Sequence, residues 1–290
     1  MKLIAKHFVG YFFILPAILT LMFLLLLPMA QGIALSFFKG DLADFYKTFV
    51  GFGNYKELFT NERTINSIER SVIFTLATVI GVFFSGMIFA LALNCNIRFR
   101  KAARTLLLLP WVISGVVAGL TWRWILNIQY GVLNDILLRL HLISKAISWL
   151  GDPNLAFLSV IIATIWRSFP FVMLMLLAGM QAIDATQYES AALDGAGPIQ
   201  RFWRITLPNL SPVLFPVILT QIIWQLNSYD LIATMSGLGP INSTETLPLN
   251  IYTNAFIYFK INYAASVGAM LLLFTLIFSS IYIYRYLKVQ

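Results

Sequence analysis

The sequence predicts an all-α integral membrane protein with six transmembrane helices. Of its 290 residues, 59% are hydrophobic and only 11% are charged, whereas a soluble domain has about 25% charged residues. The hydrophobic residues are concentrated in long runs that are separated by polar intervals. A soluble core could not bury so many long apolar runs, so we expect residues 1–290 to form a single membrane-spanning domain.

The first three spans are expected at residues 8–27, 71–93 and 105–126. A run of about 20 helical residues covers the roughly 30 Å hydrocarbon core of a bilayer. The first run is longer than the apolar part of a typical signal peptide, so we expect it to be retained as a span. In the third run, Gly115 and Gly119 have the GxxxG spacing that permits close helix packing.

The last three spans are expected at residues 155–183, 210–233 and 264–284. A short amphipathic helix is expected near residues 132–142, in the polar interval after the third span. Residues 184–208 form the longest polar interval that still has the pattern of ordered structure. We expect this interval to form a helix-turn-helix elbow outside the bilayer.

The elbow carries start and stop signals for two short helices. Asp184 is a predicted N-cap with Gln187 as its capping-box partner. Gly195 supplies the backbone freedom that ends this helix and turns the chain. Pro198 suits the first turn of the second helix, and Pro208 marks where that helix gives way to the next span.

The basic residues predict the orientation in the membrane. Six spans place both termini and the elbow on one side, and that side carries ten of the twenty Lys and Arg residues. These ten are Lys2, Lys6, Arg98, Arg100, Lys101, Arg104, Arg201, Arg204, Arg285 and Lys288. Most lie in short segments close to span ends, so the positive-inside rule makes this side cytoplasmic. The cations form no basic stripe on a polar domain, so we expect no nucleic-acid partner.

Two stripes of polar and aromatic residues occur inside the predicted spans, at comparable depth. One consists of Thr164, Arg167, Ser168 and Phe171, and the other of Gln221, Trp224, Gln225 and Ser228. Each set has the i, i+3, i+4, i+7 spacing of one helix face. Together they could line a cavity for a polyhydroxylated ligand, or bond across helices to hold the spans together. Arg167 alone could pair with a carbonyl group or with Asp230.

Several function classes lack the residues that they require. The presence of only two His and one Cys argues against a Cys/His metal site, and no GxxxxGK(S/T) motif is available to bind ATP. We therefore expect no catalytic residue, metal or cofactor on this chain. A membrane-embedded enzyme is disfavoured because HExxH and GxSxG are absent. An ion-driven secondary transporter is a weaker alternative, because none of the twelve acids falls in the middle of a span.

The elbow contains a spaced set of residues, namely Glu189, Ala191, Gly195, Ile205, Leu207 and Pro208. With this set it resembles the EAA loop of permease subunits in binding-protein-dependent ABC importers. Ser190 replaces the first alanine of the triplet, and Asp184 and Ala185 stand where this family often has a proline. Residues 49–59, 108–127, 152–157 and 244–256 resemble the carbohydrate-uptake branch, and the chain is similar to the larger maltose-system permease.

This resemblance implies a type I ABC importer permease fold, with N-in/C-in topology, in a bacterial cytoplasmic membrane. The implied partners are a second, homologous permease, two copies of an ATPase that binds ATP and Mg, and an extracytoplasmic sugar-binding protein. The two stripes would hold the transported sugar, and the elbow would couple to the ATPase. The coupling residues would be Glu189, Ala191, Ala192, Asp194, Gly195, Arg201 and Arg204. The sequence identifies neither the sugar nor whether the ATPase is shared with other importers.

Overall fold

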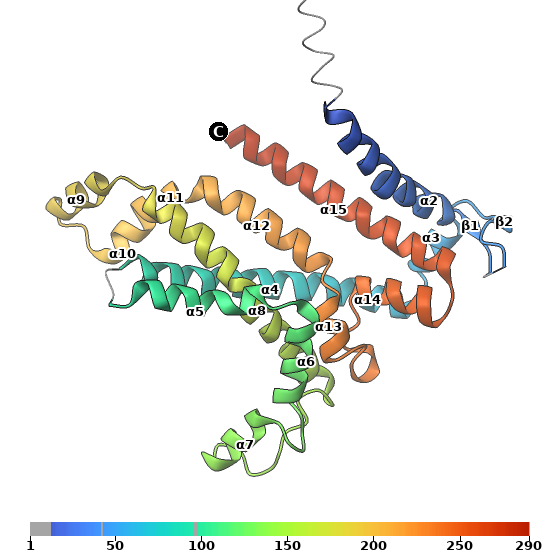
Figure 1. Cartoon of the computed structure of the whole chain (residues 1–290), viewed down its shortest axis with the longest axis horizontal. Coiled ribbons are helices and arrows are strands. Elements are labelled where there is room, and N and C mark those ends of the chain that lie inside the picture. Colours follow the sequence, from blue (N-terminus) through green and yellow to red (C-terminus); the bar gives the residue numbers. More distant parts are fainter. Residues whose placement is uncertain (1–12, 42, 96–97, 290) are drawn as a thin grey trace, which may run out of the picture. The chain divides into compact units, whose positions relative to one another are not determined.

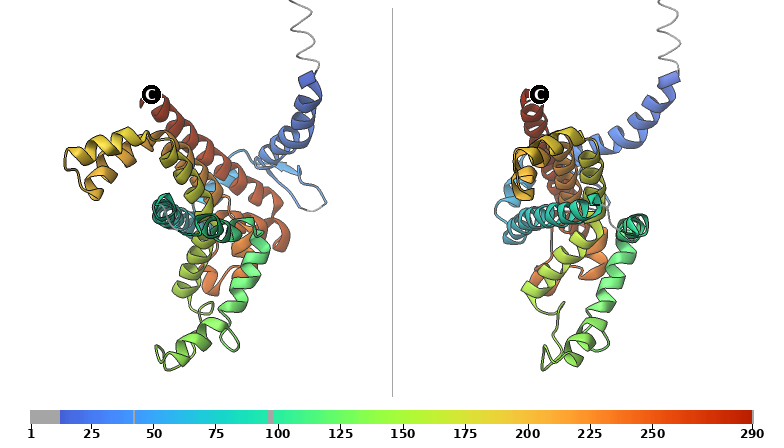
Figure 2. Two further views of the ribbon diagram at one scale, coloured as in Figure 1. Left: turned by 60° about the vertical axis from the view of Figure 1, so that its left-hand side comes forward. Right: turned by 90° about the vertical axis from the view of Figure 1, so that its left-hand side faces the viewer.

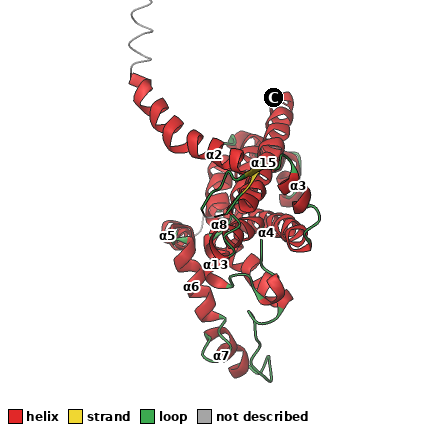
Figure 3. Cartoon of the chain, turned by 90° about the vertical axis from the view of Figure 1, so that its right-hand side faces the viewer, coloured by secondary structure: helices red, strands yellow, loops and turns green. Residues whose placement is uncertain are grey.

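The computed structural model describes residues 13–41, 43–95 and 98–289, and these are mostly helical (Figure 3). The predicted residues 8–12 of the first span, together with Lys2 and Lys6, lie outside the described residues. Four described helices are long and apolar enough to cross a membrane: Phe13–Leu35, Glu62–Asn94, Pro153–Gln181 and Ile261–Lys288. Two bent helix pairs raise the number of candidate spans to six in this part of the chain. The predicted all-α membrane architecture is confirmed.

The elements follow in a simple order. Before the second span lie the π-helical turn η1 (Met22–Leu26), α2 (Leu27–Leu35), β1 (Phe38–Lys39), β2 (Thr48–Phe49) and α3 (Gly53–Leu58). The middle of the chain contains α4 (Glu62–Asn94), α5 (Arg100–Val112), α6 (Gly115–Ile125), α7 (Val132–Arg139) and α8 (Pro153–Gln181). The elbow and fifth span contain α9 (Ala185–Leu193), α10 (Pro198–Arg201), the π-helical η2 (Phe202–Thr206), α11 (Leu207–Asn209), α12 (Ser211–Leu226) and α13 (Asp230–Met235). The chain ends with the 3-10 turn η3 (Pro240–Asn242), α14 (Leu247–Tyr252), the π-helical η4 (Thr253–Ile257) and α15 (Ile261–Val289).

The chain divides into two compact units. Unit 1 comprises residues 1–65 and 250–274, and unit 2 comprises residues 66–249 and 275–290. In unit 1, β1 and β2 form a small antiparallel hairpin in which Phe38 pairs with Phe49. Hydrogen bonds of Asn54 and Asn262 join the end of α2 and the hairpin to α3 and the start of α15.

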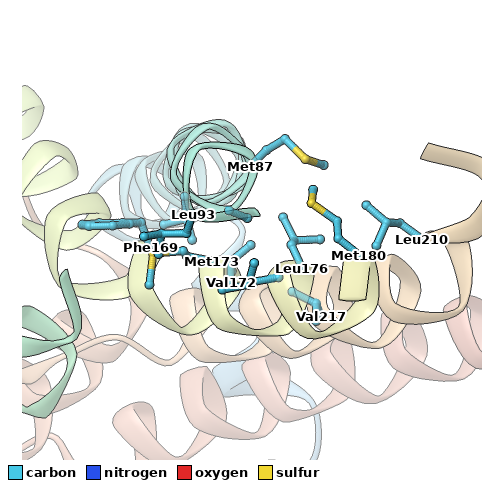
Figure 4. Packing of buried hydrophobic residues seen from close by; sticks show 12 residues of the cluster. Met87, Leu93, Phe169, Val172, Met173, Leu176, Met180, Leu210 and Val217 are labelled. Carbon is cyan, nitrogen blue, oxygen red and sulfur yellow. The ribbon is translucent and has the colours of Figure 1, made fainter. Parts of the chain in front are cut away.

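The core of unit 2 is centred on α8, whose buried side chains pack against α4 and the start of the fifth span (Figure 4). The labelled residues are Met87, Leu93, Phe169, Val172, Met173, Leu176, Met180, Leu210 and Val217. Gly86 of α4 allows close approach, because a Cβ there would lie 3.0 Å from the Cβ of Val172. Since lipid is as apolar as these side chains, this tight packing is the main source of helix association.

The predicted third span at residues 105–126 is broken into two helices, α5 and α6, that are bent by 97° (Figure 1). Figure 2 shows the bend from two further sides. The break lies at Ile113 and Ser114, whose backbone is extended. Ser114 Oγ accepts a hydrogen bond from the backbone N–H of Val117 and so caps the new helix. Hydropathy alone could not show the bend, because residues on both sides of it are apolar.

The predicted GxxxG contact is confirmed, and its partner is α13. A Cβ on Gly119 would lie 2.8 Å from the backbone oxygen of Leu231. A Cβ on Gly115 would lie 2.9 Å from the Cβ of Asp230. Neither distance leaves room for a larger residue, so both glycines are needed for α6 to lie against α13.

The predicted fifth span at residues 210–233 is also broken. The main helix, α12, ends at Leu226, and α13 begins at Asp230. Asn227 ends α12, and its Nδ2 donates to the oxygen of Ile223 at 2.8 Å, which satisfies one of the last helix carbonyls. Ser228 therefore lies beyond the helix that the i+7 spacing assumed. The short helix expected near residues 132–142 is confirmed as α7.

Candidate functional site

The first arm of the elbow is α9, which begins at the predicted N-cap. Asp184 Oδ1 accepts a hydrogen bond of 2.9 Å from the backbone N–H of Thr186. This bond holds the pKa of the Asp184 carboxyl below its usual value. The predicted capping-box role of Gln187 is wrong, because its Oε1 accepts from Asn209 Nδ2 at 3.0 Å. Gln187 therefore ties the first arm of the elbow to the second.

The turn after α9 depends on Gly195, as predicted. Its φ is +80°, in the left-handed region that favours glycine. The N–H of Ala196 donates to the oxygen of Ala191 at 2.8 Å, and the N–H of Gly195 donates to the oxygen of Ala192 at 3.1 Å. These two bonds are the Schellman pattern that ends a helix at a glycine.

The second arm begins at Pro198, as predicted, but it continues past Pro208. The segment Pro198–Asn209 runs through α10, η2 and α11 and is bent by 71° against α12. The change of direction is therefore at Leu210, a buried residue, two residues after the predicted end at Pro208. Pro208 is tolerated because it occupies the first turn of α11, where its missing N–H matters least.

The elbow presents both polar and apolar side chains to its surroundings. Of the predicted coupling residues, Glu189, Ala192, Asp194, Gly195 and Arg204 are exposed, and Ala191 and Arg201 are half-buried. The sequence reasoning missed three large apolar side chains on the same elbow. These are Leu193, Ile199 and Trp203, which are 90%, 77% and 62% exposed. Their presence in a polar interval outside the spans was the signal that could have found them.

A cavity of about 390 Å³ lies within unit 2, between α5, α8 and the broken fifth span. It is lined by Trp111, Arg167, Ser168, Trp224, Gln225, Asn227, Ser228, Tyr229, Asp230 and Leu231. Five of the eight predicted substrate-site residues are among them. The two predicted stripes therefore face one shared space, and each contributes polar groups to it.

The other three predicted residues lie outside this lining. Thr164 is buried, and its Oγ1 donates to the oxygen of Val160 in its own helix at 2.8 Å. Gln221 is also buried, and its Oε1 accepts from Gln225 Nε2 at 3.1 Å. Phe171 flanks the cavity, because its ring centroid lies 4.9 Å from that of Trp224. Gln221 and Phe171 therefore contact lining residues, whereas Thr164 bonds only within α8.

Two hydrogen bonds link the cavity residues to neighbouring helices. Gln225 Nε2 lies 3.4 Å from Ser168 Oγ, which joins α12 to α8. Arg167 Nε donates to the oxygen of Ile113 at 3.2 Å, at the break between α5 and α6. Arg167 thus pairs with a carbonyl group, and within the described residues no ion pair joins it to Asp230. The same side chains therefore line a cavity and bond between helices.

Sequence reasoning missed Trp111 as a lining residue. Its ring centroid lies 5.7 Å from that of Phe171, at the end of α5 just before the bend. A continuous third span gave no reason to select Trp111. Asp230 was predicted only as a possible partner of Arg167, and it is a second lining residue that the stripes did not include. The described residues contain no group of three or more His, Cys, Asp or Glu that could hold a metal ion.

Comparison with known proteins identifies the family. The model of the family described as "Binding-protein-dependent transport system inner membrane component" matches residues 82–288. The sulfoquinovosyl glycerol transport system permease protein SmoG of Agrobacterium fabrum is 34% identical over 269 residues, which cover 92% of this chain and 87% of SmoG. The trehalose/maltose transport system permease protein MalF of Thermococcus litoralis is 33% identical over 276 residues, with coverage of 95% and 92%.

A solved structure agrees with this assignment at the level of fold. It is a bacterial ABC transporter involved in the import of the acidic polysaccharide alginate, and a chain of it matches with a TM-score of 0.80 at 22% identity. The match covers 100% of this chain and 98% of that one. The predicted resemblance to permeases of the carbohydrate-uptake branch is confirmed. The chain is a multi-pass membrane protein that belongs to the family of inner membrane components of binding-protein-dependent transport systems.

Proposed function

We propose that the chain is one of two transmembrane subunits of an ABC importer that moves a sugar or oligosaccharide across the cytoplasmic membrane. The cavity in unit 2 carries this proposal, because it combines aromatic faces with charged and amide side chains inside a membrane protein. The similarity to SmoG and to MalF, whose names specify sugar-containing substrates, supports the same class.

The chemistry of the cavity suits a saccharide. Trp111 and Trp224 offer apolar ring faces for the C–H surfaces of a sugar. Ser168 offers a hydroxyl group and Gln225 its amide oxygen for the hydroxyls of the sugar, because Nε2 of Gln225 already donates to Ser168 and Gln221. A volume of about 390 Å³ falls within the roughly 300–1,000 Å³ of small-molecule sites, so one or two sugar rings would be held at a time.

The residues of the two stripes would have different roles. Arg167, Ser168, Trp224, Gln225 and Ser228 would contact the sugar. Phe171 would hold the two tryptophan rings in place, and Gln221 would orient the amide of Gln225. Thr164 would serve the packing of α8 alone. Because Arg167 is fixed through its Nε, its two terminal nitrogens would remain for the ligand.

The elbow would couple transport to ATP hydrolysis in a partner. Glu189 would make a polar docking contact, Ala191 and Ala192 would allow close approach, and Gly195 would hold the turn. Asp194, Arg201 and Arg204 would complete the polar contacts, and the exposed Leu193, Ile199 and Trp203 would supply the apolar ones. ATP and Mg would bind to the partner, and this chain would be neither an ATPase nor a cofactor protein.

The complete importer would contain this chain, a second homologous permease, two ATPase subunits and an extracytoplasmic sugar-binding protein. Both termini and the elbow would face the cytoplasm of a bacterium. In this arrangement, movement of the ATPase pair would reach the cavity through the elbow. The elbow would thus carry a coupling free energy between the nucleotide site and the sugar site.

Uptake measurements with cavity variants test the proposal. Trp224→Ala and Gln225→Ala should raise the KM for sugar uptake, while the same amount of ATPase co-purifies with the chain. Gln181→Ala is a matched control, because Gln181 is exposed at the last residue of α8, outside the cavity lining. If both cavity variants keep the uptake kinetics of the control, this cavity does not hold the substrate.

A further inference from the structure

Unit 1 contains two cavities that the proposed transport function does not use. The first has a volume of about 600 Å³, and seven of its ten lining residues have a polar or charged side chain. Its lining consists of Lys39, Gly40, Asp41, Ala43, Asn54, Glu57, Phe259, Lys260, Asn262 and Tyr263. The second has a volume of about 440 Å³ and an apolar lining drawn from α2, α14, η4 and α15. We call them the polar cavity and the apolar groove.

Two buried asparagines give the polar cavity fixed hydrogen-bond acceptors. Asn54 and Asn262 are only 4% and 5% exposed, and each donates its Nδ2 to two backbone oxygens at 2.8–3.0 Å. The four oxygens belong to Leu35, Ser36, Phe38 and Phe45. Each amide nitrogen is therefore fully used. Each Oδ1 accepts no hydrogen bond from a described residue and is left for a ligand in the cavity.

The charged residues that line the polar cavity include both hydrogen-bond donors and hydrogen-bond acceptors. Asp41 is already bound, because its Oδ2 accepts from Lys47 at 3.0 Å and that bond lowers its pKa. Glu57, Lys39 and Lys260 make no ion pair within the described residues. The cavity thus offers one carboxylate, two amide oxygens and two ammonium groups. A ligand that complements them carries both an anionic group and a hydrogen-bonding cation.

The apolar groove adjoins the polar cavity across the first turn of α15. Ile261 and Ala264 line the groove, while Lys260 and Asn262 line the cavity. The side chain of Leu35 lies in the groove, while its oxygen accepts from Asn262. Small residues keep the groove open along α2, η4 and α15, namely Gly32, Ala255, Ala264, Ala265, Gly268 and Ala269. The helix Phe13–Leu35, which ends with α2, and the helix Ile261–Lys288 of α15 are both long and apolar enough to cross a bilayer.

We propose that these two cavities together bind one phosphatidylethanolamine molecule. Lys39 and Lys260 receive the phosphate. The three N–H groups of the ammonium find three acceptors in Asn54 Oδ1, Asn262 Oδ1 and the Glu57 carboxylate. An acyl chain follows the small residues of the groove, where no polar group has to be buried.

The headgroup chemistry distinguishes this lipid from other common ones. Phosphatidylcholine has no N–H group, so it leaves the two fixed amide oxygens without donors. Phosphatidylglycerol has no cation, so it leaves the carboxylate of Glu57 uncompensated beside a phosphate. A transmembrane helix of a partner could fill the apolar groove, but it would have no use for the adjoining polar cavity. The start of α15, where successive residues line one cavity or the other, therefore favours a phospholipid.

Lipid analysis of the purified full-length chain, with its co-purifying subunits in mild detergent, tests the headgroup. We expect phosphatidylethanolamine to be retained through washing that removes added phosphatidylcholine and phosphatidylglycerol. Glu57→Gln should lower the retained amount roughly tenfold, as for the loss of a charge-assisted hydrogen bond. Glu62→Gln is the matched control, because Glu62 is also exposed but lies outside the cavity lining. Equal retention of all three lipids, or no difference between the two variants, would overturn the proposal.

A second variant tests the groove independently. Ala265→Phe fills the groove and should displace the lipid without touching the headgroup contacts. Full retention of phosphatidylethanolamine in Ala265→Phe would contradict the assignment of the acyl chain. Loss of a second permease with unchanged lipid would assign the groove to a partner helix and also overturn the proposal. Because Glu57 is exposed and makes no ion pair within the described residues, its variant remains a valid test even if Ala265→Phe does not fold.

Discussion

Replacing Gly195 by alanine should weaken the turn of the elbow without disturbing the membrane spans. Gly195 has a φ of +80°, and a Cβ built there meets no atom within 4 Å. The substitution therefore causes no clash, and its cost is the left-handed backbone conformation alone. That cost is roughly 1–2 kcal/mol for a residue with a side chain. A penalty of this size changes an equilibrium by a factor of about 5–30.

The elbow supplies its own control for this experiment. A Cβ on Gly197 also meets no atom within 4 Å, but the φ of Gly197 is −71° and its ψ is 168°. Alanine adopts that conformation readily, so Gly197→Ala should behave like the wild type. Gly195→Asn should be milder than Gly195→Ala, because asparagine tolerates the left-handed region better than other side chains.

Two assays report the effect of Gly195→Ala. The amount of ATPase retained on the tagged chain, measured over a salt gradient, should fall by a factor of up to about 5–30. The initial rate of ATP-dependent sugar uptake in membrane vesicles should fall with it, at equal chain content in the membrane. If Gly195→Ala and Gly197→Ala retain the same amount of ATPase and the same uptake, the turn is not part of the coupling surface.

Three further predictions concern other parts of the chain. Glu189→Lys should abolish uptake while the chain stays in the membrane, which immunoblotting of the membrane fraction checks; normal uptake would remove Glu189 from the docking surface. Gly119→Val should lower the yield and thermal stability of the purified chain, because its side chain would press against Leu231 and Thr234 of α13; an unchanged melting curve would contradict the packing. The hydrogen bond from the Thr186 N–H lowers the pKa of Asp184. The stability that this cap gives to α9 is therefore complete above the usual carboxyl pKa of 3.8, and it is lost as the pH falls through the lowered pKa. At these low pH values, hydrogen exchange at the Thr186 amide should therefore accelerate relative to exchange at neighbouring amides. A ratio of the two exchange rates that does not change with pH would contradict this prediction.

The sequence was sufficient for those features that depend on local chemistry. Asp184, Gly195 and Pro198 define the elbow through capping, a left-handed turn and a fixed φ, and the structure has all three. The GxxxG pair could be predicted because only small residues allow such close contact. The polar stripes were also visible, because charged and amide groups in an apolar run are rare.

The features that the sequence could not show depend on contacts between distant segments. The bend at Ile113 and Ser114 is invisible to hydropathy, and it is accompanied by a hydrogen bond from Arg167, 54 residues away from Ile113. The polar turn at Asn227 ends α12, and the i+7 spacing could not reveal it. Trp111 lines the cavity only because of the first break. Two helix breaks, one between α5 and α6 and one between α12 and α13, therefore shape the cavity. A prediction of uninterrupted spans contains neither break.

The most direct test of the proposed function is the composition of the complex that contains this chain. The tagged chain would be purified from its own host in mild detergent, and every co-purifying polypeptide identified by mass spectrometry. We expect an ATPase with a GxxxxGK(S/T) motif, together with a second permease that carries its own EAA-like elbow. A chain that is recovered alone, and that stays alone after cross-linking in the membrane, would contradict the importer assignment.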